Sequence, residues 1–223
     1  MHIPDGFIDL PTSAAFAGAS ALAVAGAVKG ARKQLSEQSA PLAGLTAVFI
    51  FAVQMLNFPV AAGTSGHLIG AALAMVLVGP YAATLALVVV LIIQAFLFAD
   101  GGLTALGLSI FNMAVISVWV SFGVFMLLKK IFPKTKSWLV IATFVSALIS
   151  VPAAAIGFVI QYAIGANATF SVGTVLNAMV GTHILIGIGE AIITALTVSA
   201  VLASRSDLVF GWDNKNTKLE IRS

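Results

Sequence analysis

The chain has 223 residues, of which 60% are hydrophobic and only 9% carry a charge. Soluble domains carry about 25% charged residues, so this chain cannot cover a water-facing surface, and we expect an all-α, multi-pass protein of the lipid bilayer. The absence of cysteine excludes disulfides, thiolate metal sites and thiol catalysis. The net charge of +3 reflects an orientation signal in the loops, and no nucleic-acid partner is expected.

Apolar stretches separated by polar or glycine–proline breaks predict the membrane spans. Pro11, Thr12 and Ser13 suit the start of the first helix, and Gly79 with Pro80 breaks the chain in its middle. The expected spans cover residues 12–29, 41–57, 81–98, 104–129, 137–163 and 174–204. The remaining apolar stretch, 58–79, is ambiguous.

Basic residues resolve the ambiguous stretch. All 11 lysines and arginines fall in three clusters, and the positive-inside rule places all three in the cytoplasm. The number of crossings between the first two clusters must therefore be even, whereas the other spans there supply three. Segment 58–79 must cross as well, which predicts seven spans with the amino terminus outside and a cytoplasmic tail at 205–223. The clusters are Lys29, Arg32 and Lys33; Lys129, Lys130, Lys134 and Lys136; and Arg205, Lys215, Lys218 and Arg222.

This third span is unusual because only 68–79 has a helical pattern, roughly 18 Å of helix against a hydrocarbon core of about 30 Å. Pro59, Gly63 and Gly66 interrupt the part before it. Irregular backbone survives at membrane depth only where protein or water covers it, and interrupted spans indicate a transporter's binding site. The alternative is a plain external loop followed by a short helix.

The first residues, MHIPDGFI, place a histidine directly behind Met1. The α-amine and the backbone nitrogen of His2 close a five-membered chelate ring around a metal, and the same backbone nitrogen and Nδ1 close a six-membered ring. Such a planar nitrogen set favours Ni²⁺, Cu²⁺ or Co²⁺ over Mg²⁺, Ca²⁺ or tetrahedral Zn²⁺. A secretory signal has basic residues before its apolar stretch, and this chain has none there, so we expect no signal cleavage. We also expect Met1 to be retained, because the aminopeptidase that removes methionine prefers a small second residue and histidine is large.

A histidine at position 2 leaves one corner of the square empty, so the fourth donor must come from elsewhere. His67, in GTSGH at the broken third span, is the best candidate, and the glycines there allow close approach of the backbone. The predicted metal-binding residues are therefore Met1, His2 and His67. The alternative for His67 is an ordinary polar residue at a helix start.

Two further ionisable residues lie inside the last span. His183 suits either a hydrogen-bonded structural histidine or a further ligand. Glu190 follows seven residues later on the same helix face, and it could pair with His183, cap a helix end elsewhere or balance the charge of a metal.

Four motifs resemble the CbiM/NikM family, the nickel/cobalt substrate-binding (S) components of energy-coupling factor (ECF) transporters. They are MHIPDGFI at the start, NFPVAAGTSGHLIGAALA at 57–74, FADGGLTALGLSIFNM at 98–113 and GTHILIGIGEAIITA at 181–195. The resemblance implies an S component with seven membrane helices, in which an extra first helix delivers the amino terminus into the centre of the fold. It also implies metal donors on the Met1 amine, the His2 amide and imidazole, and the His67 imidazole.

The resemblance further implies a transmembrane coupling (T) protein, two cytoplasmic ATPases and often a small accessory membrane subunit as partners. We therefore expect a single transmembrane domain over 1–223, with a metal-chelating tail at 1–11, in the cell membrane. Its expected function is capture of Ni²⁺ or Co²⁺ as the transported ligand, without enzymatic activity or a cofactor. The alternatives are a stand-alone secondary permease for divalent metals and an S component for an organic vitamin. The motifs do not choose between nickel and cobalt.

Overall fold

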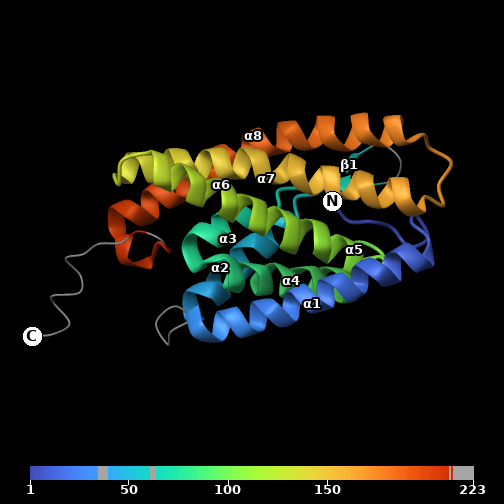
Figure 1. Ribbon diagram of the computed structural model, residues 1–223, viewed down its shortest axis with the longest axis horizontal. Coiled ribbons are helices and arrows are strands. Elements are labelled where there is room, and N and C mark those ends of the chain that lie inside the picture. Colours follow the sequence, from blue (N-terminus) through green and yellow to red (C-terminus); the bar gives the residue numbers. More distant parts are fainter. Residues whose placement is uncertain (35–39, 61–63, 211, 213–223) are drawn as a thin grey trace, which may run out of the picture.

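Long apolar helices dominate the computed structural model, which describes residues 1–34, 40–60, 64–210 and 212, and they lie side by side along its long axis (Figure 1). The elements in chain order are α1 (Leu10–Gln34), α2 (Ala40–Gln54), β1 (Phe58–Val60), β2 (Thr64–Gly66), α3 (Ala71–Val78), α4 (Pro80–Leu97), α5 (Leu106–Ile110), η2 (Phe111–Ile116), α6 (Ser117–Ile131), α7 (Lys136–Gly165), α8 (Val172–Ser204) and η3 (Ser206–Leu208).

Six of the seven predicted spans are helices over most of their length, and the predicted all-α class is confirmed. The third span, 58–79, is helical only from Ala71 to Val78. Within the described residues, 5 helices are long and apolar enough to cross a membrane, and α2 is a shorter apolar helix of 15 residues. α5, η2 and α6 together form one of the five, Leu106–Ile131. The total of seven crossings stays a prediction, because α3 has only 8 residues.

The first two basic clusters lie at one end of the bundle. Arg32 and Lys33 occupy the last turn of α1, and Lys129 and Lys130 occupy the last turn of α6. The end of α1, the start of α2, the α6–α7 connection and the end of α8 share this end, on the left in Figure 1. The positive-inside rule predicts such a grouping of lysine and arginine at the cytoplasmic end of a bundle. Lys215, Lys218 and Arg222 of the third cluster fall outside the described residues.

The interrupted third span contains an antiparallel hairpin, which the sequence did not predict. Phe58 pairs with Gly66 and Val60 pairs with Thr64. His67 and Ile69, which follow the hairpin, are fully buried, so this segment is not a plain external loop. A buried backbone must pair its polar groups, and the hairpin does so where proline and glycine disfavour a helix.

A second feature missed from the sequence is the π-helical turn η2 inside the long helix Leu106–Ile131. It carries Asn112, whose side-chain amide donates to the Gln161 Oε1 of α7 at 2.7 Å. Gly157 of α7 makes this approach possible, because a Cβ there would lie 2.8 Å from the Asn112 Oδ1. Turns of this kind frequently mark functional sites inside helices.

Glu190 caps a helix that is distant in sequence. Its two carboxylate oxygens accept from the backbone nitrogens of Ile69 at 2.6 Å and Gly70 at 3.0 Å, directly before α3. The side chain of Gln54 donates to the Ile69 carbonyl at 2.7 Å. Of the three roles left open for Glu190, the structure shows the capping role. The strap from His67 to Gly70 is thereby held by α2 on one side and α8 on the other.

The cap can be tested by comparing Glu190→Ala with Glu190→Gln. The alanine leaves two buried N–H groups without an acceptor, so we expect the free energy of unfolding to fall by about 3 kcal/mol. Glutamine keeps one acceptor oxygen and should lose less. Unfolding in SDS-containing mixed micelles, followed by tryptophan fluorescence, measures both losses. Equal stability of the alanine variant and the parent chain would contradict the capping role.

Candidate metal centre

The first nine residues form a tail that is folded into the bundle. Met1 and Ile3 are 0% exposed and His2 is 5% exposed. The tail runs beside the end of α7, where the backbone nitrogen of Asp9 donates to the Gly165 carbonyl at 2.7 Å. The Asp9 side chain then accepts from the Thr12 backbone nitrogen at 2.8 Å and caps α1. The chain therefore starts in the interior of the protein and continues from there into α1.

The loop between α4 and α5 holds the tail from the other side. The Gly102 backbone nitrogen donates to the Ile3 carbonyl at 2.8 Å, and the Asp5 carboxylate accepts from the Thr104 backbone nitrogen at 2.8 Å. Gly101 has φ +90°, and a Cβ there would lie 2.9 Å from the His2 Cβ. Glycine is therefore required at position 101 for both the backbone conformation and the close approach of His2.

Two of the three predicted site residues meet as stacked rings. The imidazoles of His2 and His67 have centroids 4.9 Å apart and an interplanar angle of 30°. The Nδ1–H of His67 donates to the neighbouring Leu68 carbonyl at 2.8 Å. Its buried Nε2 has no hydrogen-bond partner among the described residues, so it presents a lone pair.

The third predicted residue is Met1, and its candidate donor is the α-amine. Burial lowers the pKa of the Met1 α-amine to about 4, although the Asp100 carboxylate opposes this shift. The amine is therefore uncharged at neutral pH and has a lone pair. Desolvation, with a smaller contribution from the charged form of this amine, also holds the pKa of the His2 imidazole well below its usual range. The His2 backbone nitrogen donates to the Ser65 Oγ of β2 at 3.4 Å.

His183 of α8 belongs to the same neighbourhood. The sequence had left its role open between a structural histidine and a further ligand. The amino terminus is close enough for its charged form to act on both His67 and His183. The Nδ1–H of His183 donates to the Met179 carbonyl at 2.7 Å, as expected of a structural histidine. Its Nε2 is buried without a partner in the described part of the chain. All three histidines therefore lie within electrostatic range of the amino terminus.

Side chains alone do not complete a metal site here. Among the described residues, no group of three or more His, Asp and Glu side chains is arranged to hold a metal ion. A site at the amino terminus must therefore recruit main-chain nitrogen atoms. Beside it, a cavity of about 270 Å³ lies between tail residues 2–5 and loop residues 99–102.

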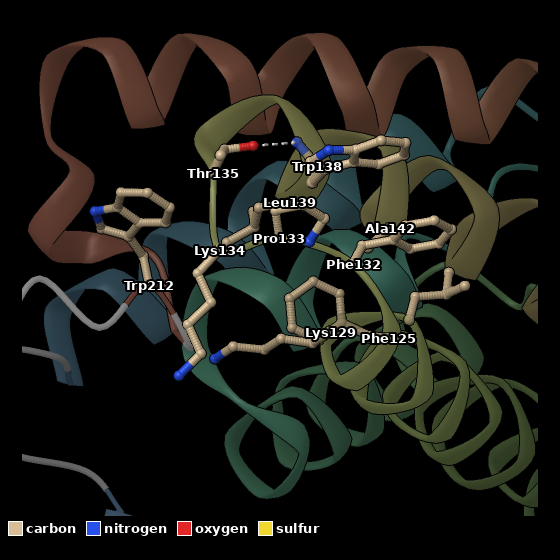
Figure 2. Close-up of a pocket in the computed structure, with 11 residues that line it drawn as sticks. Phe125, Lys129, Phe132, Pro133, Lys134, Thr135, Trp138, Leu139, Ala142 and Trp212 are labelled. Atoms are coloured by element: carbon tan, nitrogen blue, oxygen red, sulfur yellow. Dashed lines mark hydrogen bonds between the residues drawn. The ribbon is translucent and has the colours of Figure 1, made fainter.

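Another cavity, of about 250 Å³, lies at the opposite, basic end of the bundle. It is lined by aromatic rings, including Phe132 and Trp138, and by Lys129 and Lys134 (Figure 2). Two ammonium groups disfavour a cation there. The neighbourhood of the amino terminus is therefore the better candidate for binding a cation.

The chain is similar to known metal transport proteins over most of its length. A family model described as CbiM, the cobalt uptake substrate-specific transmembrane region, matches residues 2–208. A Haloquadratum walsbyi protein whose name assigns it provisionally to metal transport is 37% identical over 225 residues, covering 100% of both chains. The fused nickel transport protein NikMN of Rhodobacter capsulatus is 33% identical, covering 94% of this chain and 64% of that protein.

A crystal structure described as a transition metal transporter superposes with a TM-score of 0.87 at 29% sequence identity. The match covers 100% of this chain and 99% of that chain. The fold of this protein is thus shared over its whole length with a transition metal transporter. The chain belongs to the CbiM family of substrate-specific transmembrane transport components.

Proposed function

We propose that the chain captures Ni²⁺ or Co²⁺ on the outer side of the cell membrane as the S component of an ATP-driven ECF importer. The observation that carries the proposal is the free amino terminus, buried without charge beside the rings of His2 and His67. The names of the relatives support nickel or cobalt as the transported ion, and neither is preferred.

The proposed ligand set contains four nitrogen atoms. They are the Met1 amine, the backbone nitrogen and the imidazole of His2, and the Nε2 of His67. The first three share one short piece of chain, and His67 approaches from the strap behind the hairpin. A deprotonated amide is a strong donor for ions that accept square-planar geometry, whereas Mg²⁺ and Ca²⁺ prefer oxygen ligands. Binding releases protons, because the amide must lose its hydrogen.

Release of such a chelated ion requires a movement that opens the ligand set. Ser65 of the hairpin and Gly102 of the following loop contact the tail, so we propose the segments 57–67 and 98–103 as the gate. In this proposal, a transmembrane coupling protein and two cytoplasmic ATPases supply the movement, together with a small accessory membrane subunit in some transporters. The amino terminus faces outward and the basic end of the bundle faces the cytoplasm.

The direct test adds a single glycine before Met1, which moves the amine out of the chelate. We expect the affinity for Ni²⁺ in calorimetry to fall at least about a hundredfold, equivalent to roughly 3 kcal/mol. The visible absorption of the planar nickel site should disappear with it. A chain with one glycine added after Ser223 is the matched control and should bind normally. Unchanged affinity of the first variant would exclude the amine as a ligand.

A second test concerns the fit between loop and tail. Gly101→Ala introduces a Cβ 2.9 Å from the His2 Cβ, so we expect nickel affinity to fall about tenfold, because overpacking of this kind costs about 1–3 kcal/mol. Gly6→Ala is the matched control, because Gly6 also has positive φ, +76°, but has no neighbouring atom within 4 Å of the added Cβ. Calorimetry measures the nickel affinity of both variants. Equal losses of affinity would show that backbone strain alone, and not the contact with His2, causes the effect.

Uptake experiments separate the proposal from a stand-alone permease. The chain reconstituted alone in proteoliposomes should bind radioactive nickel without accumulating it. Accumulation should require the coupling protein, the ATPases and ATP, since none of the described elements of this chain forms a nucleotide-binding loop. Accumulation by the chain alone, without ATP, would favour the permease.

A further inference from the structure

Asp100 stands at the outer mouth of the candidate site, and its position is fixed by the loop that follows α4. The Asp100 backbone nitrogen donates to the Gln94 carbonyl at 3.1 Å, and the preceding Ala99 has the unusual φ of +52°. The Asn57 side chain contacts both carboxylate oxygens, at 3.4 and 3.3 Å. A non-glycine residue with positive φ indicates a local conformation that its surroundings impose.

The carboxylate faces the imidazole of His2. Its Oδ2 lies 3.4 Å from the His2 Nε2, and the Asp100 side chain is 17% exposed. The Nε2 itself is buried and makes no hydrogen bond within the described residues, so Asp100 is the acceptor within reach.

We propose that Asp100 is a positioning residue of the metal site, because its carboxylate accepts the Nε2–H of His2 and so keeps the Nδ1 of His2 free for the ion. This inference rests on the proposed function. Only Nδ1 can close the six-membered chelate ring with the backbone nitrogen of the same residue. A neutral imidazole carries its proton on one nitrogen, and the partner of the other nitrogen selects which. A carboxylate in this position also makes the imidazole a stronger donor.

The other two histidines show why the assignment is testable. His67 and His183 each direct Nδ1 at a backbone carbonyl, at 2.8 and 2.7 Å, so their protons reside on Nδ1. His2 should be the exception, with its proton on Nε2. Because the chain has 3 histidines, each ring can be assigned by single substitution. The two tautomers have distinct ¹⁵N chemical shifts.

The experiment uses the metal-free full chain, labelled with ¹⁵N in its histidine rings and held in lipid nanodiscs. We expect one ring with Nε2–H, assigned to His2, and two rings with Nδ1–H. In Asp100→Ala, the His2 signal should move toward the Nδ1–H tautomer, and nickel affinity should fall by about 10- to 100-fold. Asp100→Asn is the matched variant, because it removes the charge but keeps an acceptor oxygen. Its His2 tautomer and affinity should stay closer to those of the parent chain.

Each outcome bears on the inference. An Nδ1–H tautomer of His2 in the parent chain would overturn it without any variant, even if Asp100→Ala fails to fold. Equal losses in the asparagine and alanine variants would reduce Asp100 to an attractor of cations. If the glycine-extended chain binds nickel normally, the proposed chelate itself is wrong. If that extension abolishes binding while Asp100→Ala keeps the tautomer and the affinity, the role of Asp100 alone is wrong.

Discussion

The structure depends on the burial of an amino terminus in the middle of a membrane protein. A charged amine in such a place costs several kcal/mol, so the group gives up its proton and its pKa falls to about 4. An uncharged amine is a metal donor, whereas a charged ammonium is not. Under the proposed function, the same desolvation that would destabilise an ordinary terminus prepares this one for binding. The desolvation is complete at Met1 and Ile3, which are both fully buried.

Polar contacts between distant elements keep the surroundings of the tail in place. Glu190 and Gln54 hold the strap behind His67, and Asn112 joins η2 to Gln161 of α7. The loop with Gly101 fits against His2 itself. A metal site works only when its donors are held near their final geometry, and elements packed in the bundle provide this better than free loops do. Under the proposed function, release of the ion from such a closed arrangement requires the coupling partner to move these elements.

The sequence predicted what depends on local pattern. Apolar stretches located the long helices, whereas the chelate expected from the order of Met1 and His2 stays a prediction. His67 was predicted from its place in a glycine-rich, broken span, and the structure stacks it on His2. These predictions needed no knowledge of contacts between distant residues.

What the sequence could not predict depends on contacts across the chain. The hairpin arises because a buried backbone must pair its polar groups, and the residues alone indicate only that a helix is unfavourable. Three further contacts join residues that lie between 49 and 121 positions apart in the sequence. They are Asn112 with Gln161 at the π-helical turn, Glu190 with Ile69 at the helix cap, and Asp100 with His2. His183 had a plausible structural role, and only the fold brings it beside the amino terminus.

The most direct test of this account is the position of the ion itself. Anomalous diffraction at the nickel absorption edge, from crystals of the native chain grown with Ni²⁺, locates the metal without assumptions about its ligands. The account predicts a peak within bonding distance of the Met1 amine, the His2 backbone and ring nitrogens and the His67 Nε2. A peak in the outer mouth beside Asp5 and Asp100, or at the basic end of the bundle, with none at the amine, would contradict it.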